Sequence, residues 1–236
     1  MKFIVYFLLF AHITIAQNPT TATDVGTWNI WNVKINLHKK WSVFGETQLR
    51  SLGFYQQFHY YEYKTGVNFH LNKHFSLAVG TGNYHTYSEG GNFLLPKKNE
   101  EFRTWLQVYM HQYLDIIKFE HRYRVEQRWL LQEYRNRFRY RINMLIPLNS
   151  KKIATKTIYF TAWNEIFMSN QPAFFERNRF FVGLGYEATP YFAFQAGYLH
   201  QLDYKVTTTE KSFFQISCLV ELKRKLGKEE EMPVAE

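Results

Sequence analysis

Two stretches of the sequence decide the fold: Ile117-Lys-Phe-Glu-His-Arg-Tyr-Arg-Val-Glu-Gln-Arg128 and Arg135-Asn-Arg-Phe-Arg-Tyr-Arg-Ile-Asn-Met-Leu-Ile146. In both, apolar and charged residues alternate with a period of two, as on a β-strand with one apolar and one polar face. A helix would scatter the charge, because Arg135 and Arg137 would lie about 200° apart around its axis. The stretches therefore predict two neighbouring strands that share an arginine-rich face.

That face carries seven arginines: Arg122, Arg124, Arg128, Arg135, Arg137, Arg139 and Arg141. Arginine on the lipid side of a barrel costs roughly 2–4 kcal/mol at the bilayer midplane. Seven such costs would exceed the whole stability of an ordinary domain, about 5–15 kcal/mol. We therefore expect the arginines to point into the lumen of a barrel and the apolar residues to face lipid.

The same alternation recurs in nine further segments, which gives eleven strand candidates in all. These segments are 31–37, 41–49, 61–71, 75–87, 103–111, 157–168, 177–187, 191–203 and 212–223. Single-chain bacterial outer-membrane barrels have an even number of strands. We therefore expect an all-β, transmembrane, antiparallel up-and-down β-barrel of twelve strands, with ten strands as the alternative.

The connections between these candidates alternate in length. Short turns are expected at 38–40, 72–74, 114–115, 147–155 and 188–190, and longer or more polar loops at 51–58, 88–100, 169–176 and 204–211. Short periplasmic turns and long external loops are typical of outer-membrane barrels. The alternation favours a barrel over a soluble sandwich, which has no reason to sort its loops by length.

Composition points the same way with less force. Aromatic residues make up 19% of the chain and charged residues 21%, a combination that suits a barrel with aromatic girdles and a polar lumen. A soluble, aromatic-rich β-protein such as a lectin fits the composition about equally well. The formal net charge of +9 is also found in nucleic-acid-binding proteins, but an exported protein seldom meets nucleic acid.

The N-terminus predicts export. Met1-Lys2 is a basic start, Phe3 to Phe10 is an unbroken apolar run, and Thr14-Ile15-Ala16 fits a small-x-small cleavage site. We expect a signal peptide over 1–16 that is cleaved near Ala16, an N-terminal segment over 17–26, a barrel over 27–223 and a charged periplasmic tail over 224–236. The expected location is the outer membrane of a Gram-negative bacterium, and the single cysteine, Cys218, excludes an intramolecular disulfide.

Several of these elements resemble the DUF2490 family of predicted outer-membrane proteins, which is common in Bacteroidetes and some proteobacteria. They are Glu120-His-Arg-Tyr-Arg-Val-Glu126, Arg135-Asn-Arg-Phe-Arg-Tyr-Arg141, Pro147-Leu-Asn149, Asn178-Arg-Phe-Phe-Val-Gly-Leu-Gly-Tyr186 and Gly197-Tyr-Leu-His-Gln201. The likeness covers residues 25 to 223. It implies an outer-membrane barrel but no activity and no catalytic residues. One departure is the charged tail, because outer-membrane strands often end the chain on an aromatic residue.

The arginine-rich face supports two hypotheses about function. Carboxylates of the same inward parity can pair with the arginines, close the lumen and hold the strands in register, as expected of a structural or accessory envelope protein. Alternatively, the surplus positive charge binds or passes an anion such as phosphate, a carboxylate or an acidic lipid headgroup. The residues of this candidate site are Glu120, Arg122, Arg124, Glu126, Arg128, Glu133, Arg135, Arg137, Arg139, Arg141 and Glu165.

Signatures of catalysis are weaker, and we expect no enzymatic activity. A lipid-modifying surface enzyme, the second alternative, needs a Ser or Asp nucleophile beside a His. The candidates are His85 with Ser88, His200 with Asp203, and His121. Both pairs are three residues apart, so their members point to opposite faces of a strand.

Metal binding has no better support. His70 with His74 and His59 with Tyr61 lie close in sequence, but neither pair brings a third and fourth ligand at a suitable spacing. We expect no metal site and no cofactor. The expected partners are outer-membrane lipid and lipopolysaccharide, together with a small anionic ligand if the arginine surplus is functional, and no nucleic acid.

Overall fold

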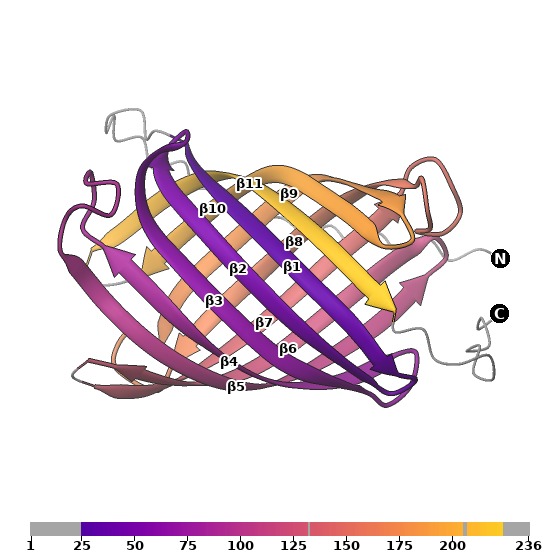
Figure 1. Cartoon of the computed structure of the whole chain (residues 1–236), viewed down its shortest axis with the longest axis horizontal. Coiled ribbons are helices and arrows are strands. Elements are labelled where there is room, and N and C mark those ends of the chain that lie inside the picture. The colour runs from indigo at the N-terminus through magenta and orange to yellow at the C-terminus, as the bar shows by residue number, and fades with distance from the viewer. Residues whose placement is uncertain (1–24, 132, 205–206, 224–236) are drawn as a thin grey trace, which may run out of the picture.

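The structure is a computed structural model that describes residues 25–131, 133–204 and 207–223. These residues form a closed barrel of strongly tilted strands (Figure 1). In chain order the strands are β1 (Gly26–His38), β2 (Trp41–Gly53), β3 (Gln56–His70), β4 (Phe75–Tyr87), β5 (Lys97–Leu114), β6 (Ile117–Leu130), β7 (Tyr134–Pro147), β8 (Ile158–Ser169), β9 (Phe175–Thr189), β10 (Phe192–Tyr204) and β11 (Thr208–Lys223). The predicted signal peptide, most of the segment 17–26 and the tail 224–236 lie outside the described residues.

Eleven strands close the barrel, so the predictions of twelve and of ten were wrong. The expected purely antiparallel sheet was wrong at one seam. In an up-and-down order with an odd number of strands, the first and last strands run in the same direction, and β1 pairs with β11 in parallel from Gly26↔Phe213 to Asn36↔Lys223. A parallel ladder also satisfies the backbone groups of both strands, so closure does not require an even number. Gly26 and Lys223 consequently lie at opposite ends.

The connections are not sorted by length. At the end we call the Lys39 end, on the right in Figure 1, the chain turns at 39–40, 71–74, 115–116, 148–157 and 190–191. At the opposite Glu89 end it turns at 54–55, 88–96, 131–133, 170–174 and 205–207. Each end has one long connection and four of five residues or fewer, because strands such as β2 and β3 continue into regions expected to be loops. Loop length therefore gives no orientation for this barrel.

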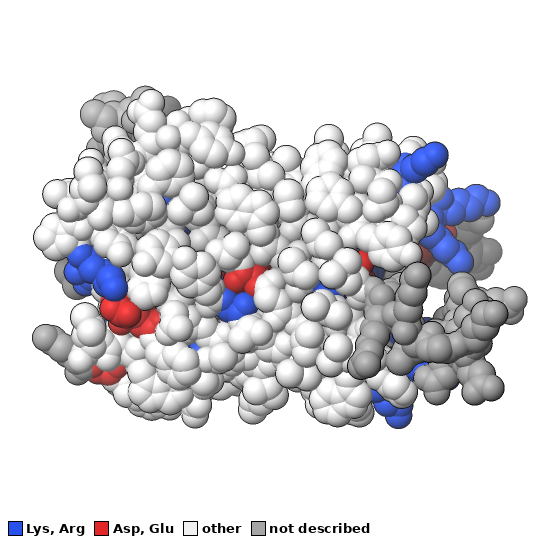
Figure 2. All heavy atoms as spheres, in the orientation of Figure 1, with Lys and Arg blue, Asp and Glu red and all other residues white. Residues whose placement is uncertain are grey.

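The face of the outer wall that Figure 2 shows carries little charge between the two ends. In the view of Figure 2, charged side chains gather at the ends, and one small patch of both signs appears between them. Many outward positions of β4 to β6 are apolar and exposed, for example Val79 (58% exposed), Leu106 (64%) and Val125 (44%). The predicted division into an apolar outer face and a charged inner face is confirmed along these strands. Within the described residues, no helix is long and apolar enough to cross a membrane.

Part of the interior is an ordinary apolar core. Trp28, Trp163, Phe181, Leu199 and Phe213 form a buried cluster beside β1 and β8 to β11. The Phe181 ring stacks on Trp163 at 5.4 Å between centroids. Glycines leave room for this ring, since a Cβ on either Gly183 or Gly197 would lie 2.7 Å from its Cζ. The cluster fills one side of the lumen and leaves the other side to the charged residues.

Candidate functional site

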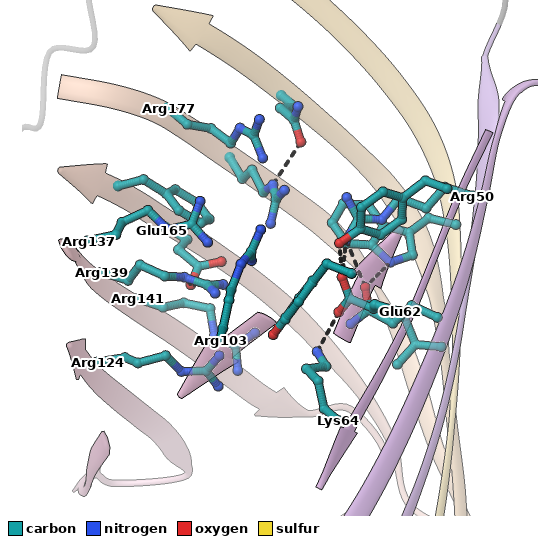
Figure 3. A pocket seen from close by; sticks show the side chains of 18 of the residues that line it. Arg50, Glu62, Lys64, Arg103, Arg124, Arg137, Arg139, Arg141, Glu165 and Arg177 are labelled. Atoms are coloured by element: carbon teal, nitrogen blue, oxygen red, sulfur yellow. Dashed lines mark hydrogen bonds and ion pairs between the residues drawn. The ribbon is translucent and has the colours of Figure 1, made fainter. Parts of the chain in front are cut away.

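A cavity of about 1580 Å³ occupies the lumen. Its lining extends from Glu89 and Lys211 at the Glu89 end to His70 and His111 towards the Lys39 end. Figure 3 shows charged side chains that point into it from opposite walls: Arg50, Glu62, Lys64, Arg103, Arg124, Arg137, Arg139, Arg141, Glu165 and Arg177. The candidate site is therefore a charged chamber within the barrel.

Glu126 on β6 organises the first ion group and is fully buried. Its carboxylate accepts hydrogen bonds from Arg137 (Nε, 2.8 Å), Arg139 (Nη1, 2.6 Å) and Arg124 (Nη1, 3.3 Å). Arg137 is directly opposite Glu126 on β7, and Arg139 is directly opposite Arg124. Like charges placed opposite one another destabilise a sheet, so the shared carboxylate offsets the repulsion between the arginines of the two strands.

Glu165 on β8 organises the second group and is 2% exposed. It accepts hydrogen bonds from Arg139 (Nε, 3.0 Å; Nη2, 2.8 Å) and forms an ion pair with Arg122. In register it lies between Arg141 on β7 and Arg179 on β9. Four arginines therefore surround one carboxylate, and their positive charge exceeds its negative charge.

Arg141 and Arg179 form no salt bridge of their own. Among the described residues, no carboxylate lies within 4.0 Å of either guanidinium group, whereas both line the cavity. Arg141 is also directly opposite Arg122, whose buried Nε has no hydrogen-bond partner in the described part of the chain. Arg122, Arg141 and Arg179 therefore bring more hydrogen-bond donors and positive charge to this part of the chamber than the Glu165 carboxylate can accept and neutralise.

Two further ion groups complete the charged wall, and the sequence reasoning did not anticipate either. Glu101 accepts hydrogen bonds from Arg103 at 2.7 Å and pairs with Arg128. Glu62 binds Arg50 at 3.2 Å and Lys64 at 2.7 Å. The signal that could have found these residues is inward parity on their strands, the same signal that identified the arginines of β6 and β7.

Aromatic rings support many of the guanidinium groups. Arg50 lies between Trp28 and Tyr60, at 3.5 Å and 4.0 Å from their ring centroids. Arg179 lies 4.7 Å from the centroid of Trp28, and Arg141 lies 5.4 Å from that of Trp163. Cation–π contacts of this kind stabilise a desolvated guanidinium. They also place tryptophans close to the two arginines that lack a carboxylate.

The expected site residues divide into two sets. The buried Arg/Glu network is confirmed around Glu126 and Glu165. Glu120 does not pair with an arginine, because its register partner is Asn143 and its carboxylate binds Lys118 at 2.7 Å. Glu133 lies in the connection 131–133 and pairs with Arg135 at the rim, with 47% of its side chain exposed.

The candidate catalytic pair His200 and Asp203 is divided between the two faces of β10, as its three-residue spacing predicts. His200 points to the outer wall, whereas Asp203 is inside and pairs with Arg177. The ring of His85 lies against that of Tyr61, with 4.7 Å between centroids and a tilt of 35°, and the Nδ1 of His121 shares a hydrogen bond of 2.9 Å with the hydroxyl of Tyr140. Among the described residues, no group of three or more His, Cys, Asp or Glu side chains is placed to hold a metal ion.

One ion pair joins the connection 88–96 to β11 at the Glu89 end. Lys211 donates a hydrogen bond of 2.8 Å to Glu89. This bond holds the pKa of Glu89 below its usual value. Glu89 therefore stays ionised beside the mouth of the chamber at neutral pH.

Comparison with known proteins gives one match. The family model described as "Protein of unknown function (DUF2490)" matches residues 25–212, from just before β1 into the last strand. No curated protein matches the chain, and no solved structure matches it.

Proposed function

The chain belongs to the DUF2490 family, and we propose that it is an outer-membrane barrel that binds a small oxyanion in its lumen. The observation that carries this proposal is the pair Arg141 and Arg179, which flank Glu165, line the cavity and have no ion pair with a carboxylate among the described residues. Arginine pairs with carboxylate and phosphate through two parallel hydrogen bonds. A ligand of that kind would neutralise the surplus charge around Glu165.

The membrane location rests on the outer wall and on the N-terminus. Exposed apolar side chains such as Val79 and Leu106 cover a wall on which, in the view of Figure 2, charge gathers mainly at the ends. A soluble barrel of this kind would expose a large apolar surface to water, which monomeric soluble proteins rarely do. The expected signal peptide over residues 1–16 supports export.

A purely structural lumen is the competing function, and Arg141 separates the two. A structural arginine has a carboxylate partner, as Arg137 has in Glu126. Arg141 instead faces Arg122 directly across β6 and β7 and is one of four arginines around Glu165. Replacing it removes a repulsion and leaves Glu165 paired with Arg122 and Arg139. We expect Arg141→Gln to leave the stability of the barrel unchanged or raised, whereas a structural role predicts that it falls.

The binding test uses inorganic phosphate and the tryptophans near the site. Trp163 lies by Arg141 and Trp28 by Arg179, so bound phosphate should change the tryptophan fluorescence of the barrel in detergent at low salt. Loss of a charge-assisted hydrogen bond is worth about 1.5–3 kcal/mol, or roughly 10- to 100-fold in affinity. We expect that weakening in both Arg141→Gln and Arg179→Gln.

Arg135→Gln is the matched control, because Arg135 is also on β7 but already pairs with Glu133 at the rim. It should leave phosphate affinity within about two-fold. Wild-type protein that shows no saturable response to phosphate, or variants that bind as tightly as wild type, would refute the proposal.

A narrow anion-selective passage is a second candidate, favoured by the extent of the cavity lining towards both ends. It predicts conductance in planar bilayers with a reversal potential set by the anion gradient. Absence of conductance would eliminate the passage and leave the binding proposal standing.

A further inference from the structure

Four polar side chains meet on the outer wall of the β10–β11 hairpin, near the Glu89 end. Tyr198 and His200 are on β10, and Glu210 and Ser212 are on β11. His200 and Ser212 are directly opposite in register. Their neighbours in sequence, Leu199 and Phe213, belong to the buried interior, so Tyr198, His200 and Ser212 face outward, while Glu210 lies at the rim and also borders the cavity.

Their contacts have the order of a catalytic triad. The Nδ1 of His200 lies 3.3 Å from the Oγ of Ser212, and the Nε2 of His200 lies 3.8 Å from the carboxylate of Glu210. The hydroxyl of Tyr198 shares a hydrogen bond of 2.6 Å with the Oγ of Ser212. Serine beside a histidine that is in turn oriented by a carboxylate is the arrangement that activates a hydroxyl nucleophile, and it occurs on unrelated folds.

We propose that Ser212, His200 and Glu210 form the active site of an esterase that hydrolyses fatty acyl esters at the surface of the barrel, with Tyr198 as the oxyanion donor. Ser212 and His200 are on the opposite side of the wall from the anion-binding chamber, and Glu210 lies at the rim between the two. The esterase site goes beyond the function proposed for the lumen and does not depend on it.

The reaction is a two-step ester hydrolysis. The Ser212 Oγ attacks the ester carbonyl carbon while its proton passes to the Nδ1 of His200, and the Tyr198 hydroxyl donates a hydrogen bond to the oxyanion. The C–O bond to the alcohol then breaks, and the leaving alkoxide takes the proton from His200. Water attacks the acyl-Ser212 ester, gives its proton to His200, and releases a fatty acid as the proton returns to Ser212.

Glu210 acts on the second ring nitrogen. With substrate bound, its carboxylate would accept a hydrogen bond from the Nε2–H of His200, which would leave Nδ1 free to receive the proton and would stabilise the imidazolium that forms. The His200–Glu210 separation of 3.8 Å would shorten with substrate bound, because catalytic hydrogen bonds are often long before the substrate arrives. Both side chains are accessible, with 32% and 63% of their surfaces exposed.

The surroundings select an acyl chain as the substrate group. Phe180 is opposite His200 on β9 and is 47% exposed. Phe214 follows the triad on β11 and lies near Phe54, with 6.5 Å between ring centroids. Exposed aromatic rings at this end of an apolar wall suit a lipid whose acyl chain lies along the barrel and whose ester linkage lies at the height of Ser212.

The test is covalent labelling of the full barrel in detergent with an alkyl fluorophosphonate, which reacts with activated serines. Mass spectrometry should place the adduct on Ser212 in the wild-type protein. General-base catalysis contributes about 10²–10⁴-fold, so His200→Gln should slow labelling at least roughly 100-fold. Ser212→Ala should abolish the adduct.

His121→Gln is the matched control, because His121 also lies on the outer wall and bonds a tyrosine hydroxyl, yet has no part in the triad. It should label at the wild-type rate. No adduct on Ser212, or an adduct that forms equally fast in His200→Gln, would overturn the proposal.

A second readout covers the case in which His200→Gln does not fold. Tyr198→Phe keeps the aromatic ring and loses only the hydroxyl. Removal of one oxyanion donor lowers turnover about 10²–10³-fold, so this variant should hydrolyse palmitoyl-oleoyl phosphatidylglycerol in mixed micelles at least roughly 100-fold more slowly than the wild type. Wild-type protein that releases no fatty acid from these micelles, or a variant with unchanged turnover, would overturn the assignment.

Discussion

Removal of the Glu126 carboxylate gives the sharpest test of the luminal network. In Glu126→Gln the volume is kept, but the negative charge that three arginines share through hydrogen bonds of 2.5–3.3 Å is lost. Arg137 is 2% exposed, so it cannot turn to water. Breaking a buried ion pair by removing one partner costs about 3–5 kcal/mol, and we expect a loss of that size in the free energy of unfolding.

Glu120→Gln is the matched control, because it makes the same change on the same strand. Glu120 binds Lys118 at 2.7 Å, and 26% of each side chain is exposed. Ion pairs that reach water are worth about 0–1 kcal/mol. Denaturant unfolding of the two variants, followed by tryptophan fluorescence, should therefore separate them by at least about 2 kcal/mol. Equal midpoints would refute the view that Glu126 holds β6 and β7 together.

Two further predictions concern the wall. Gly80→Ala places a Cβ 2.3 Å from the Trp105 ring, whereas a Cβ at Gly45 meets nothing within 4 Å. Thermal unfolding should show that Gly80→Ala lowers the free energy of unfolding by about 1–3 kcal/mol and that Gly45→Ala does not lower it. Val79→Arg puts a charge on the middle of the outer wall, where 58% of the side chain is exposed, and should lower stability in lipid bilayers by roughly 2–4 kcal/mol. Leu94→Arg, in the connection 88–96 and 92% exposed, should have little effect, and equal behaviour of the two arginine variants would argue against a bilayer location.

The alternation of apolar and polar residues predicted every strand, because successive side chains of a barrel strand face the outside and the lumen in turn. The alternation did not predict where the strands begin and end. Segment 103–111 was expected, but β5 runs from Lys97 to Leu114, and its first residues pair with β4 at Asn99↔Thr86 and Glu100↔His85. There the strand extends beyond the apolar wall, so the sequence Lys97-Lys-Asn-Glu-Glu101 no longer alternates although the backbone ladder continues.

The candidate site was predictable only in part, for a geometric reason. Inward parity on β6 and β7 is a local property, and it identified the arginines together with Glu126. Glu101 is on β5 and Glu62 is on β3. Their pairing depends on the register between strands and on which side chains reach across the lumen. The contact of His200 with Ser212 could not be predicted for a related reason, since it depends on the register of β10 with β11, which places these residues opposite each other although they are twelve positions apart in the chain.

The two proposals can be tested independently because they lie on opposite sides of one hairpin. Gln201 faces the lumen and accepts a hydrogen bond of 2.8 Å from Arg179, whereas His200, one residue earlier, contacts Ser212 on the outside. A change at His200 that also weakened phosphate binding would therefore indicate damage to the β10–β11 hairpin. A change confined to serine labelling would locate the chemistry on the outer wall, and Arg179→Gln should produce the reverse pattern.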